Sequence, residues 1–493
     1  MTIANMNDWL ARNTGQTYGN FIDGEWRASV SGEAAAVYNA ADREQLLGYF
    51  QQSQAEDVWT AVEAAHRAFA IWSTTSPSER SAVLLRFADL LEANREELAY
   101  RLSAEQGKVL AESLGEVGRA AKEARFAAGE GLRMGGEALP ADSGIGYHTL
   151  ERQPIGVVAA IAPWNFPVVT PVRKIAPALA YGCTVVYKPA SATPWTSTKL
   201  MELLREAGVP DGAVNLVSGA GGAVGNALVG HPLVKGITFT GSTGLGIGIQ
   251  LKAAERLART QLELGGKNAA VVLDYSNVQY VAKQISAAAF ACSGQRCTAI
   301  SRVVVLQEHA EELTAALKRQ MEQLAIGPAW DKSAAVGPLV NQAHLDSVQK
   351  HLHAALEEGA ELTYGGEVLT EGVYASGAYM RPALLVGVQP GMKAAQEEIF
   401  GPVLSVLSAA SEDEALQIAN GTVYGLASCV FTERIAAVRR FAAELESGMV
   451  HINTGTASEA HIPFGGVKMS GFGAYSIGSS NREFFTESKV VYY

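Results

Sequence analysis

Apolar side chains recur at helical spacing between residues 57 and 135. They follow one another at steps of three and four residues, as from Val58 to Phe69 and from Leu84 to Leu91. This spacing gathers them on one face of a helix. The region is therefore predicted to form amphipathic helices that cover another layer of the fold.

After residue 145 the pattern changes to short β-branched or aliphatic runs separated by helical stretches. The expected strands of the first series are residues 156–162, 184–188, 213–217, 236–240 and 269–273. Those of the second series are residues 302–307, 380–386, 403–406, 425–430 and 448–452. Because strands that alternate with helices pair in parallel βαβ units, the predicted fold class is α/β with two lobes.

Length and composition favour a large globular protein. A chain of 493 residues exceeds what one hydrophobic core serves and suggests about three structural units. Apolar residues make up 48% and charged residues 18%, which excludes a disordered or fibrous chain. The net charge of -11 and the lack of a Lys/Arg run argue against nucleic acid as a partner.

The sequence predicts neither export nor membrane insertion. Residues 1–20 lack the basic start and apolar middle of a secretory signal, and runs such as residues 157–164 are too short to cross a bilayer. We therefore expect a cytoplasmic protein without a membrane partner. No Cys, His and carboxylate group has zinc-ligand spacing, so no metal site is expected. The chain has four cysteines, which are expected to be thiols: Cys183, Cys292, Cys297 and Cys429.

A glycine-rich turn after one expected strand is a candidate phosphate site. Residues 236–240 are followed by Gly241, Ser242 and Gly246 ahead of a helical stretch, 249–259. A helix N-terminus offers N–H groups and a dipole that favour an anion. The spacing departs from G-x-G-x-x-G, so a purely structural turn is the alternative.

A lysine ends another expected strand. Residues 184–188 finish at Lys188, and Ser191 follows three positions later. Ligands of open α/β sheets bind at this carboxyl edge, so Lys188 is a candidate phosphate ligand, with a solvated surface cation as the alternative. Together with the glycine-rich turn, it favours a nucleotide site.

Cys297 is a candidate nucleophile. It follows a Gly-Gln turn, stands beside Arg296, and is expected at the start of a helix. A helix N-terminus and a nearby cation both stabilise a thiolate. The alternative interpretation is a small core residue.

Two further segments carry polar groups suited to catalysis. Glu263 lies between apolar neighbours before a Gly-Gly break, where desolvation would raise the pKa of its carboxyl towards the range of a general base. Asn165 stands in Pro163-Trp164-Asn165-Phe166-Pro167, a rigid loop that can hold an amide donor where an oxyanion develops. A surface carboxylate and a stiff turn are the alternatives.

Taken together, these segments resemble the aldehyde dehydrogenase superfamily. The resemblance runs from about Phe21 to the C-terminus. It rests on seven motifs in order: 163–167, Lys188-Pro189, 241–246, 263–267, Gly294-Gln295-Arg296-Cys297, Glu398-Ile399-Phe400-Gly401-Pro402 and Pro463-Phe464-Gly465-Gly466.

The resemblance implies a role for each of these residues. Cys297 would attack the aldehyde carbon, Asn165 and the Cys297 N–H would hold the oxyanion, Glu263 would activate water, and Lys174 would support proton transfer. Glu398 would bind the nicotinamide ribose. The expected cofactor-binding residues are Trp164, Lys188, Ser191, Gly241, Ser242, Gly246, Glu398 and Phe400.

The resemblance also implies three structural parts. A Rossmann-like cofactor domain would comprise residues 1–125 and 146–259, and a catalytic domain residues 260–469. A small β arm, residues 126–145 and 470–493, would join subunits into a homodimer or homotetramer.

Two positions bear on the cofactor and on the fate of the acyl group. The carboxylate of Glu263 is shared with family members that hydrolyse the thioester. Members that pass the acyl group to coenzyme A resemble this chain elsewhere but lack a carboxylate at this position. Relatives often carry Glu where this chain has Ser191, and that Glu repels a 2'-phosphate. NAD and NADP are therefore both expected cofactors, with NADP favoured.

The substrate is expected to be a small acid semialdehyde. The region around Arg173 resembles succinic and α-ketoglutaric semialdehyde dehydrogenases, in which an arginine at this place pairs with the substrate carboxylate. The alternative for Arg173 is a salt bridge within the helix layer, and Ala291 replaces a second arginine of the succinic enzymes.

Two other functions stay open. One is a broad aliphatic or aromatic aldehyde dehydrogenase, and the other is a non-catalytic binding protein. In the first of these, the substrate tunnel would be lined by Trp164, Phe166, Phe290 and Phe464.

Overall fold

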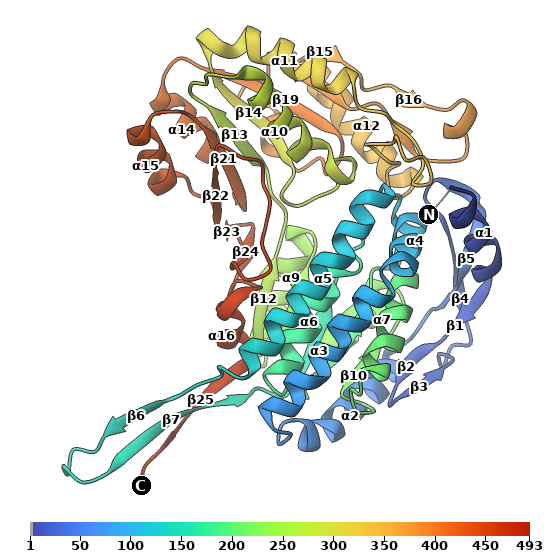
Figure 1. Cartoon of the computed structure of the whole chain (residues 1–493), viewed down its shortest axis with the longest axis vertical. Helices are drawn as coiled ribbons and strands as arrows, with labels where there is room; N and C mark the ends of the chain where they lie inside the picture. The colour runs from blue at the N-terminus through green and yellow to red at the C-terminus, as the bar shows by residue number, and fades with distance from the viewer. Residues whose placement is uncertain (1–2) are drawn as a thin grey trace.

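A computed structural model describes residues 3–493 and places two large β-sheets at the centres of two lobes (Figure 1). The first sheet has eight strands in the order β24-β12-β11-β8-β9-β10-β2-β3, and β12 to β10 run parallel. Its strands are β2 (Asn20–Ile22), β3 (Glu25–Arg27), β8 (Val157–Ile161), β9 (Thr184–Lys188), β10 (Val214–Leu216), β11 (Val234–Thr240), β12 (Arg259–Glu263) and β24 (Gly471–Phe472).

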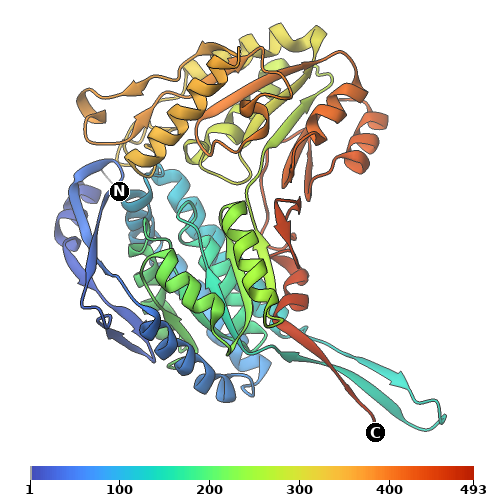
Figure 2. The ribbon, with the colours of Figure 1, turned by 180° about the vertical axis from the view of Figure 1, so that it is seen from behind.

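Helices cover both faces of this sheet because its central strands are apolar on both sides. Alternate residues of β8 show this: Val157 and Ala159 pack with α2 and α9, whereas Val158 and Ala160 pack with α3, α5 and α6. Figures 1 and 2 show the two helical layers from opposite sides. The helices are α2 (Ala55–Trp72), α3 (Pro77–Ala93), α4 (Arg95–Gln106), α5 (Leu110–Gly131), α6 (Val169–Ala180), α7 (Trp195–Glu206), α8 (Asn226–Gly230) and α9 (Thr243–Ala254).

The second sheet has seven strands in the order β15-β18-β19-β14-β13-β21-β22, and only β15 is antiparallel. Its strands are β13 (Asn268–Val272), β14 (Ile300–Leu306), β15 (Glu361–Tyr364), β18 (Ala383–Val386), β19 (Val403–Ala409), β21 (Ala427–Phe431) and β22 (Met449–Ile452). Its helices are α10 (Val278–Phe290), α11 (Ala310–Glu322), α12 (Gln342–Glu357), α13 (Lys393–Gln396), α14 (Glu412–Asn420) and α15 (Ile435–Glu444). The two α/β lobes predicted from the sequence are confirmed.

Some expected strands differ in extent. Residues 380–386 were predicted to form one strand, but Pro382 separates β17 (Tyr379–Met380) from β18, since proline cannot donate to a β-ladder. Residues 425–430 likewise divide between β20 (Tyr424–Gly425), which pairs with β23 (Val467–Lys468), and β21. A short β16 (Val368–Leu369) pairs with β17.

The N-terminal region forms a sheet that the sequence did not predict. α1 (Ile3–Asn13) precedes β1 (Gln16–Tyr18), β4 (Ala34–Asn39) and β5 (Asp42–Gln51), in the order β1-β5-β4. Polar and apolar residues do not alternate regularly in β4 and β5. These strands therefore lack the two-residue alternation by which a half-buried strand is recognised in a sequence.

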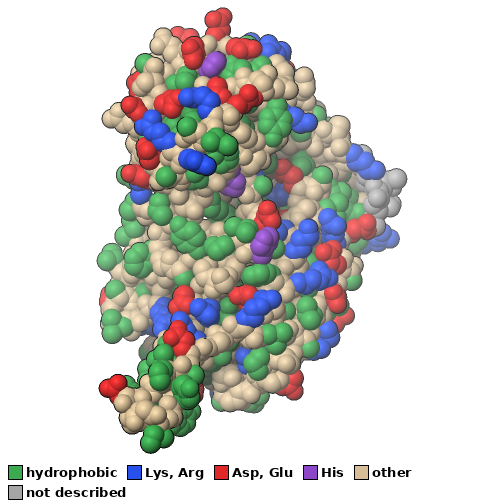
Figure 3. All heavy atoms as spheres, turned by 60° about the vertical axis from the view of Figure 1, so that its left-hand side comes forward, with side chains coloured by type: hydrophobic (Ala, Val, Ile, Leu, Met, Phe, Trp, Pro, Cys, Tyr) green, Lys and Arg blue, Asp and Glu red, His purple; other side chains and the backbone are tan. Residues whose placement is uncertain are grey.

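A β arm projects from the body of the molecule (Figures 1 and 2). It consists of β6 (Glu137–Pro140), β7 (Tyr147–Pro154) and β25 (Thr486–Val491), which follows the short α16 (Asn481–Phe485). The hairpin was expected within residues 126–145, but α5 continues to Gly131. Figure 3 shows hydrophobic side chains along the arm; those exposed on it include Leu139, Ile145, Tyr147 and Tyr492.

Sheet membership bears on the expected domain limits. The predicted break at residue 260 falls inside β12, and β24 belongs to the first sheet although residues 470–493 were assigned to the arm. Within residues 3–493 no helix is long and apolar enough to cross a membrane.

Candidate active site

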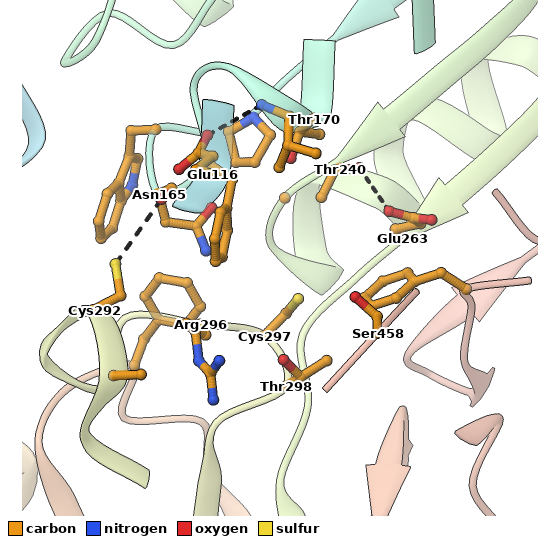
Figure 4. Close-up of a pocket in the computed structure, with 18 of the residues that line it drawn as sticks. Glu116, Asn165, Thr170, Thr240, Glu263, Cys292, Arg296, Cys297, Thr298 and Ser458 are labelled. Carbon is orange, nitrogen blue, oxygen red and sulfur yellow. Dashed lines mark hydrogen bonds between the residues drawn. The ribbon is translucent and has the colours of Figure 1, made fainter. Parts of the chain in front are cut away.

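A cavity of about 560 Å³ lies where the two lobes meet, and residues from both lobes line it. Among the residues singled out in the sequence, it is lined by Trp164, Asn165, Phe166, Arg173, Gly241, Ser242, Glu263, Cys297, Glu398, Phe400 and Phe464. Figure 4 shows Cys297 between Asn165 on one side and Glu263 and Ser458 on the other. The sequence therefore identified residues that the fold brings together from distant segments.

Cys297 lies in a turn between a 3-10 segment, Ala291–Gly294, and β14. No helix begins there, so the expected stabilisation of a thiolate by a helix N-terminus is wrong. Burial and the carboxylates of Glu263 and Glu398 raise the pKa of the Cys297 thiol to about 12, which outweighs the opposite effect of Arg173 and Arg296. The thiol is therefore protonated at neutral pH, and a base must accept its proton during attack.

Backbone strain and hydrogen bonds hold the loop before the nucleophile. Cys292 and Ser293 have φ values of +54° and +57°, which few residues other than glycine adopt. Gly294 has φ +72°, and a Cβ there would lie 2.3 Å from the Gly401 carbonyl oxygen. The Gln295 side-chain oxygen accepts from the Val340 N–H at 2.9 Å. The loop is therefore fixed by its own geometry and by contacts with the second lobe.

The Asn165 side chain is oriented towards this loop. It lies between β8 and α6, and its Nδ2 donates to the Gln295 carbonyl at 2.9 Å. Lys108 Nζ donates to the Asn165 carbonyl at 2.9 Å and pairs with Glu116 at 2.6 Å, both side chains being buried. Nothing in the sequence around Lys108 or Glu116 signalled this support.

Glu263 ends β12 and is buried against the cavity. Its carboxylate accepts from Thr240 Oγ1 at 3.2 Å and from the Ser476 hydroxyl, and Arg173 Nη1 lies 4.0 Å away. Burial raises the pKa of Glu263, while Arg173 and Lys174 oppose that change. The expectation of a raised carboxyl pKa is confirmed.

Arg173 is engaged by another carboxylate. Its Nε and Nη2 donate to Glu123 at 3.0 and 2.9 Å, and its guanidinium lies 4.8 Å from the centre of the Phe464 ring. The salt bridge within the helix layer, which the sequence left open, is therefore present, although Arg173 also lines the cavity.

Replacing Arg173 with Met is expected to destabilise the fold by about 3 kcal/mol, because it leaves the buried Glu123 carboxylate with Arg119 alone. Thermal and urea unfolding of the variant measure this loss. Arg125→Met, which breaks only exposed ion pairs between α5 and α3, is the control and should cost at most about 0.5 kcal/mol. Equal losses in both variants would contradict the structural role of the Arg173 pair.

Several predicted residues lie outside the cavity lining, among them Lys174 and Phe290. Lys174 Nζ donates to Thr238 Oγ1 at 3.1 Å, and burial lowers the pKa of Lys174 to about 8. Phe290, expected in the substrate tunnel, is packed in the core under the second sheet because α10 ends there and the chain turns. Ala291 lines the cavity instead.

Several cavity residues fit a dinucleotide. Ser242 precedes α9, whose first turn has no side-chain cap, so its N–H groups are available to an anion. Glu398 accepts from the Gly266 N–H at 3.0 Å, and burial raises the pKa of Glu398 to about 7. Trp164 meets the Phe400 ring edge-on, with centroids 5.4 Å apart.

Other cofactor candidates lie along the same sheet edge. Lys188 ends β9 opposite Ile161 of β8, and its Nζ donates to the Pro189 carbonyl at 2.9 Å. Burial lowers the pKa of Lys188 to about 8. Ser191 Oγ donates to the Gly219 carbonyl at 3.2 Å. Gly246 is not in the cavity lining; a Cβ there would lie 2.4 Å from the Leu264 side chain, so it permits close helix packing.

Comparison with known proteins identifies the family. A model described as the aldehyde dehydrogenase family matches residues 26–491. The chain belongs to the aldehyde dehydrogenase family. It is 41% identical over 477 residues to the α-ketoglutaric semialdehyde dehydrogenase of Bacillus subtilis strain 168, covering 97% of this chain and 98% of the relative.

Two further similarities concern the cofactor. This aldehyde dehydrogenase is 37% identical over 452 residues to the succinate-semialdehyde dehydrogenase (NADP+) of Escherichia coli K12, covering 92% of this chain and 93% of the relative. A crystal structure of an NAD-dependent aldehyde dehydrogenase from Sinorhizobium meliloti matches with a TM-score of 0.95 and 33% identity, covering 98% of this chain and 96% of that one. The protein is an NAD(P)-dependent enzyme that oxidises aldehydes.

Proposed function

We propose that this aldehyde dehydrogenase converts a small acid semialdehyde to a dicarboxylic acid through a hydrolysed thioester on Cys297. The observation that carries the proposal is one cavity holding a thiol, a buried carboxylate and an oriented amide: Cys297, Glu263 and Asn165. The acid-semialdehyde class is supported by the names of the Bacillus subtilis and Escherichia coli relatives, which act on α-ketoglutaric and succinic semialdehyde.

In the first step Cys297 Sγ bonds to the aldehyde carbon. Its proton passes to Glu263, directly or through a water molecule, because the thiol is protonated at rest. The carbonyl oxygen becomes an oxyanion, stabilised by the second N–H of the Asn165 amide and the Cys297 backbone N–H. Bound oxidised NAD(P) would supply the hydride acceptor for this carbon, which would leave a thioester on Cys297.

After Glu263 has released this first proton to solvent, it removes a proton from the water that attacks the thioester carbon. The carbon–sulfur bond breaks, the carboxylic acid leaves, and the Cys297 sulfur recovers a proton. Lys174 lies behind Glu263 and favours its ionised form, which suits a positioning role in proton transfer. Since a carboxylate is present here, hydrolysis is favoured over transfer to coenzyme A.

The cofactor residues would divide between the two ends of the dinucleotide. Trp164, Glu398 and Phe400 would hold the nicotinamide riboside, Gly241 and Ser242 the pyrophosphate, and Lys188 with Ser191 the adenosine ribose. Gly246 would act through helix packing rather than contact. We also propose a cytoplasmic homodimer or homotetramer joined through the β arm, which exposes apolar side chains.

We expect kcat/KM with NADP to equal or exceed that with NAD. Ser191→Glu should lower kcat/KM with NADP about 30-fold, because the new carboxylate repels the 2'-phosphate beside Lys188, and the loss with NAD should be far smaller. Ser191→Ala, which removes the hydroxyl without adding charge, is the control. A strong NAD preference of the native enzyme would overturn this assignment.

A panel of acidic and neutral aldehydes, assayed with both cofactors, tests the substrate class. The proposal requires kcat/KM for succinic or α-ketoglutaric semialdehyde to exceed that for butanal and benzaldehyde. A second candidate, a broad aliphatic or aromatic aldehyde dehydrogenase, is favoured by the aromatic lining of Trp164, Phe166 and Phe464. Equal values across the panel would select it, and no activity with any aldehyde would indicate a non-catalytic protein.

A further inference from the structure

One buried ion pair lies directly behind the loop that carries Asn165. Lys108 stands in the segment between α4 and α5, and Glu116 stands on α5. Their side chains are each 1% exposed, and Lys108 Nζ lies 2.6 Å from a Glu116 oxygen. Both residues line the cavity, although neither takes part in the chemical steps proposed for Cys297 and Glu263.

The pair contacts the loop at both of its ends. At the start of the loop, Lys108 Nζ donates to the Asn165 carbonyl at 2.9 Å and lies 3.9 Å from the centre of the Phe166 ring. At the end of the loop, Glu116 Oε1 accepts from the backbone N–H groups of residues 168 and 169, at 2.9 and 3.1 Å. The backbone is therefore fixed on both sides of the turn from which α6 begins.

These contacts supply geometry more than stability. A buried ion pair gains little stability over apolar side chains of similar volume, because both charges must leave water. Within residues 3–493, the hydrogen bonds of Lys108 and Glu116 all end on each other or on residues 165–169. What the pair provides is a fixed position for the backbone of Asn165, and hence for its side-chain amide.

Helix α5 also holds the loop before the nucleophile. The Glu112 carboxylate accepts from the Cys292 N–H at 3.0 and 3.1 Å, and Glu116 lies one helical turn further along the same face of α5. Figure 4 shows Glu116 and Cys292 on the Asn165 side of Cys297. One helix of the first lobe thus contacts both the loop of the amide and the loop of the thiol, and it sets the spacing between them.

We propose that the Lys108–Glu116 pair positions the Asn165 amide for the oxyanion. Lys108 is a positioning residue, because its ammonium group is already taken up by Glu116, the Asn165 carbonyl and the Phe166 ring. The inference rests on the oxyanion role proposed for Asn165. A shift of about 1 Å in such a donor costs up to about 10²-fold in rate.

A double-mutant cycle tests the proposal. Asn165→Ala should lower kcat about 10²-fold, since it removes an oxyanion donor, and Lys108→Met should lower kcat about 30-fold. In an Asn165→Ala enzyme the added Lys108→Met should cost less than about 3-fold, because the group that it positions is already gone. The loss should be the same for succinic semialdehyde and butanal, while the KM for each aldehyde and the affinity for NADP change little.

Two further variants separate positioning from folding. Lys199→Met, which removes a lysine from an ion pair with Glu97 outside the cavity, is the control and should keep the native kcat. Lys108→Met leaves a buried carboxylate unpaired, so Lys108→Met with Glu116→Gln is the second form of the test. Glutamine keeps an oxygen for the N–H groups of residues 168 and 169, but the Asn165 carbonyl still loses its donor. If Lys108→Met does not fold, the same cycle with Asn165→Ala is run on this charge-free pair.

Each outcome decides a separate question. If Asn165→Ala keeps the native kcat, the oxyanion role of Asn165 fails, and the inference fails with it. If Asn165→Ala is slow but the loss of Lys108 costs the same factor in both backgrounds, Lys108 does not act through Asn165, and only the inference is overturned. A native kcat in Lys108→Met, or a loss that appears only in KM, would overturn it as well.

Discussion

Cys297→Ala is expected to lower aldehyde-dependent reduction of NADP on the order of 10⁴-fold or more, because it removes the thiol that forms the thioester. The fold should be retained, since the Cys297 side chain lies in the cavity rather than in a sheet core. Steady-state kinetics with an acid semialdehyde, together with thermal unfolding and NADP binding, measure the effect.

Cys292→Ala is the matched control in the same loop. Cys292 also lines the cavity, but its thiol is buried and contacts Gln106 and the Asn165 carbonyl. This variant should keep most of the turnover. The reverse result, an active Cys297→Ala and an inactive Cys292→Ala, would move the nucleophile to the other cysteine.

Glu263→Gln is expected to reduce turnover about 10³-fold through loss of the general base. Glutamine keeps the hydrogen bonds with Thr240 and Ser476 but cannot take a proton. If hydrolysis of the thioester suffers most, one equivalent of reduced cofactor per subunit appears quickly and later turnovers are slow. Rapid-mixing absorbance of the reduced nicotinamide detects this burst.

The pH profile gives a second measurement of Glu263. Burial raises the pKa of Glu263, and the base must be ionised, so kcat of the native enzyme should rise with pH as that group loses its proton. The rising limb should be absent in Glu263→Gln. An identical profile in both enzymes would assign the limb to a different group.

The parts of the fold that the sequence predicted are those with a strong local pattern. β9 was predicted with its observed limits because Val185, Val186 and Tyr187 form a short run of strand-favouring residues between Gly182 and Pro189. β4 and β5 were missed because their stability comes from pairing with each other rather than from a pattern in either. The arm was predicted to begin at residue 126, but helix α5 continues to Gly131. Nothing in the composition of α5 marks where this helix ends.

The candidate site was predicted as far as its motifs extend. Cys297, Glu263 and Asn165 stand in short segments whose composition signals chemistry, and all three line one cavity. The partner of Arg173 could not be predicted from the sequence. Glu123 lies 50 positions earlier, in helix α5, and nothing in the sequence of that helix distinguishes it from the other glutamates there. The thiol pKa was predicted in the wrong direction, since burial by three-dimensional neighbours outweighs the local Arg296.

The segment that leaves β12 and enters β13 belongs to both lobes at once. It carries Glu263 at its start, its Gly266 N–H binds Glu398, and Asn268 Nδ2 donates to the Cys297 carbonyl at 2.7 Å. A chimaera could join this cofactor lobe to the catalytic lobe of another dehydrogenase within residues 264–267. Such a junction would separate this segment from the residues of the catalytic lobe that it contacts. Lobe exchange should succeed only when residues 263–268 and the segments around Cys297 and Glu398 travel as one unit.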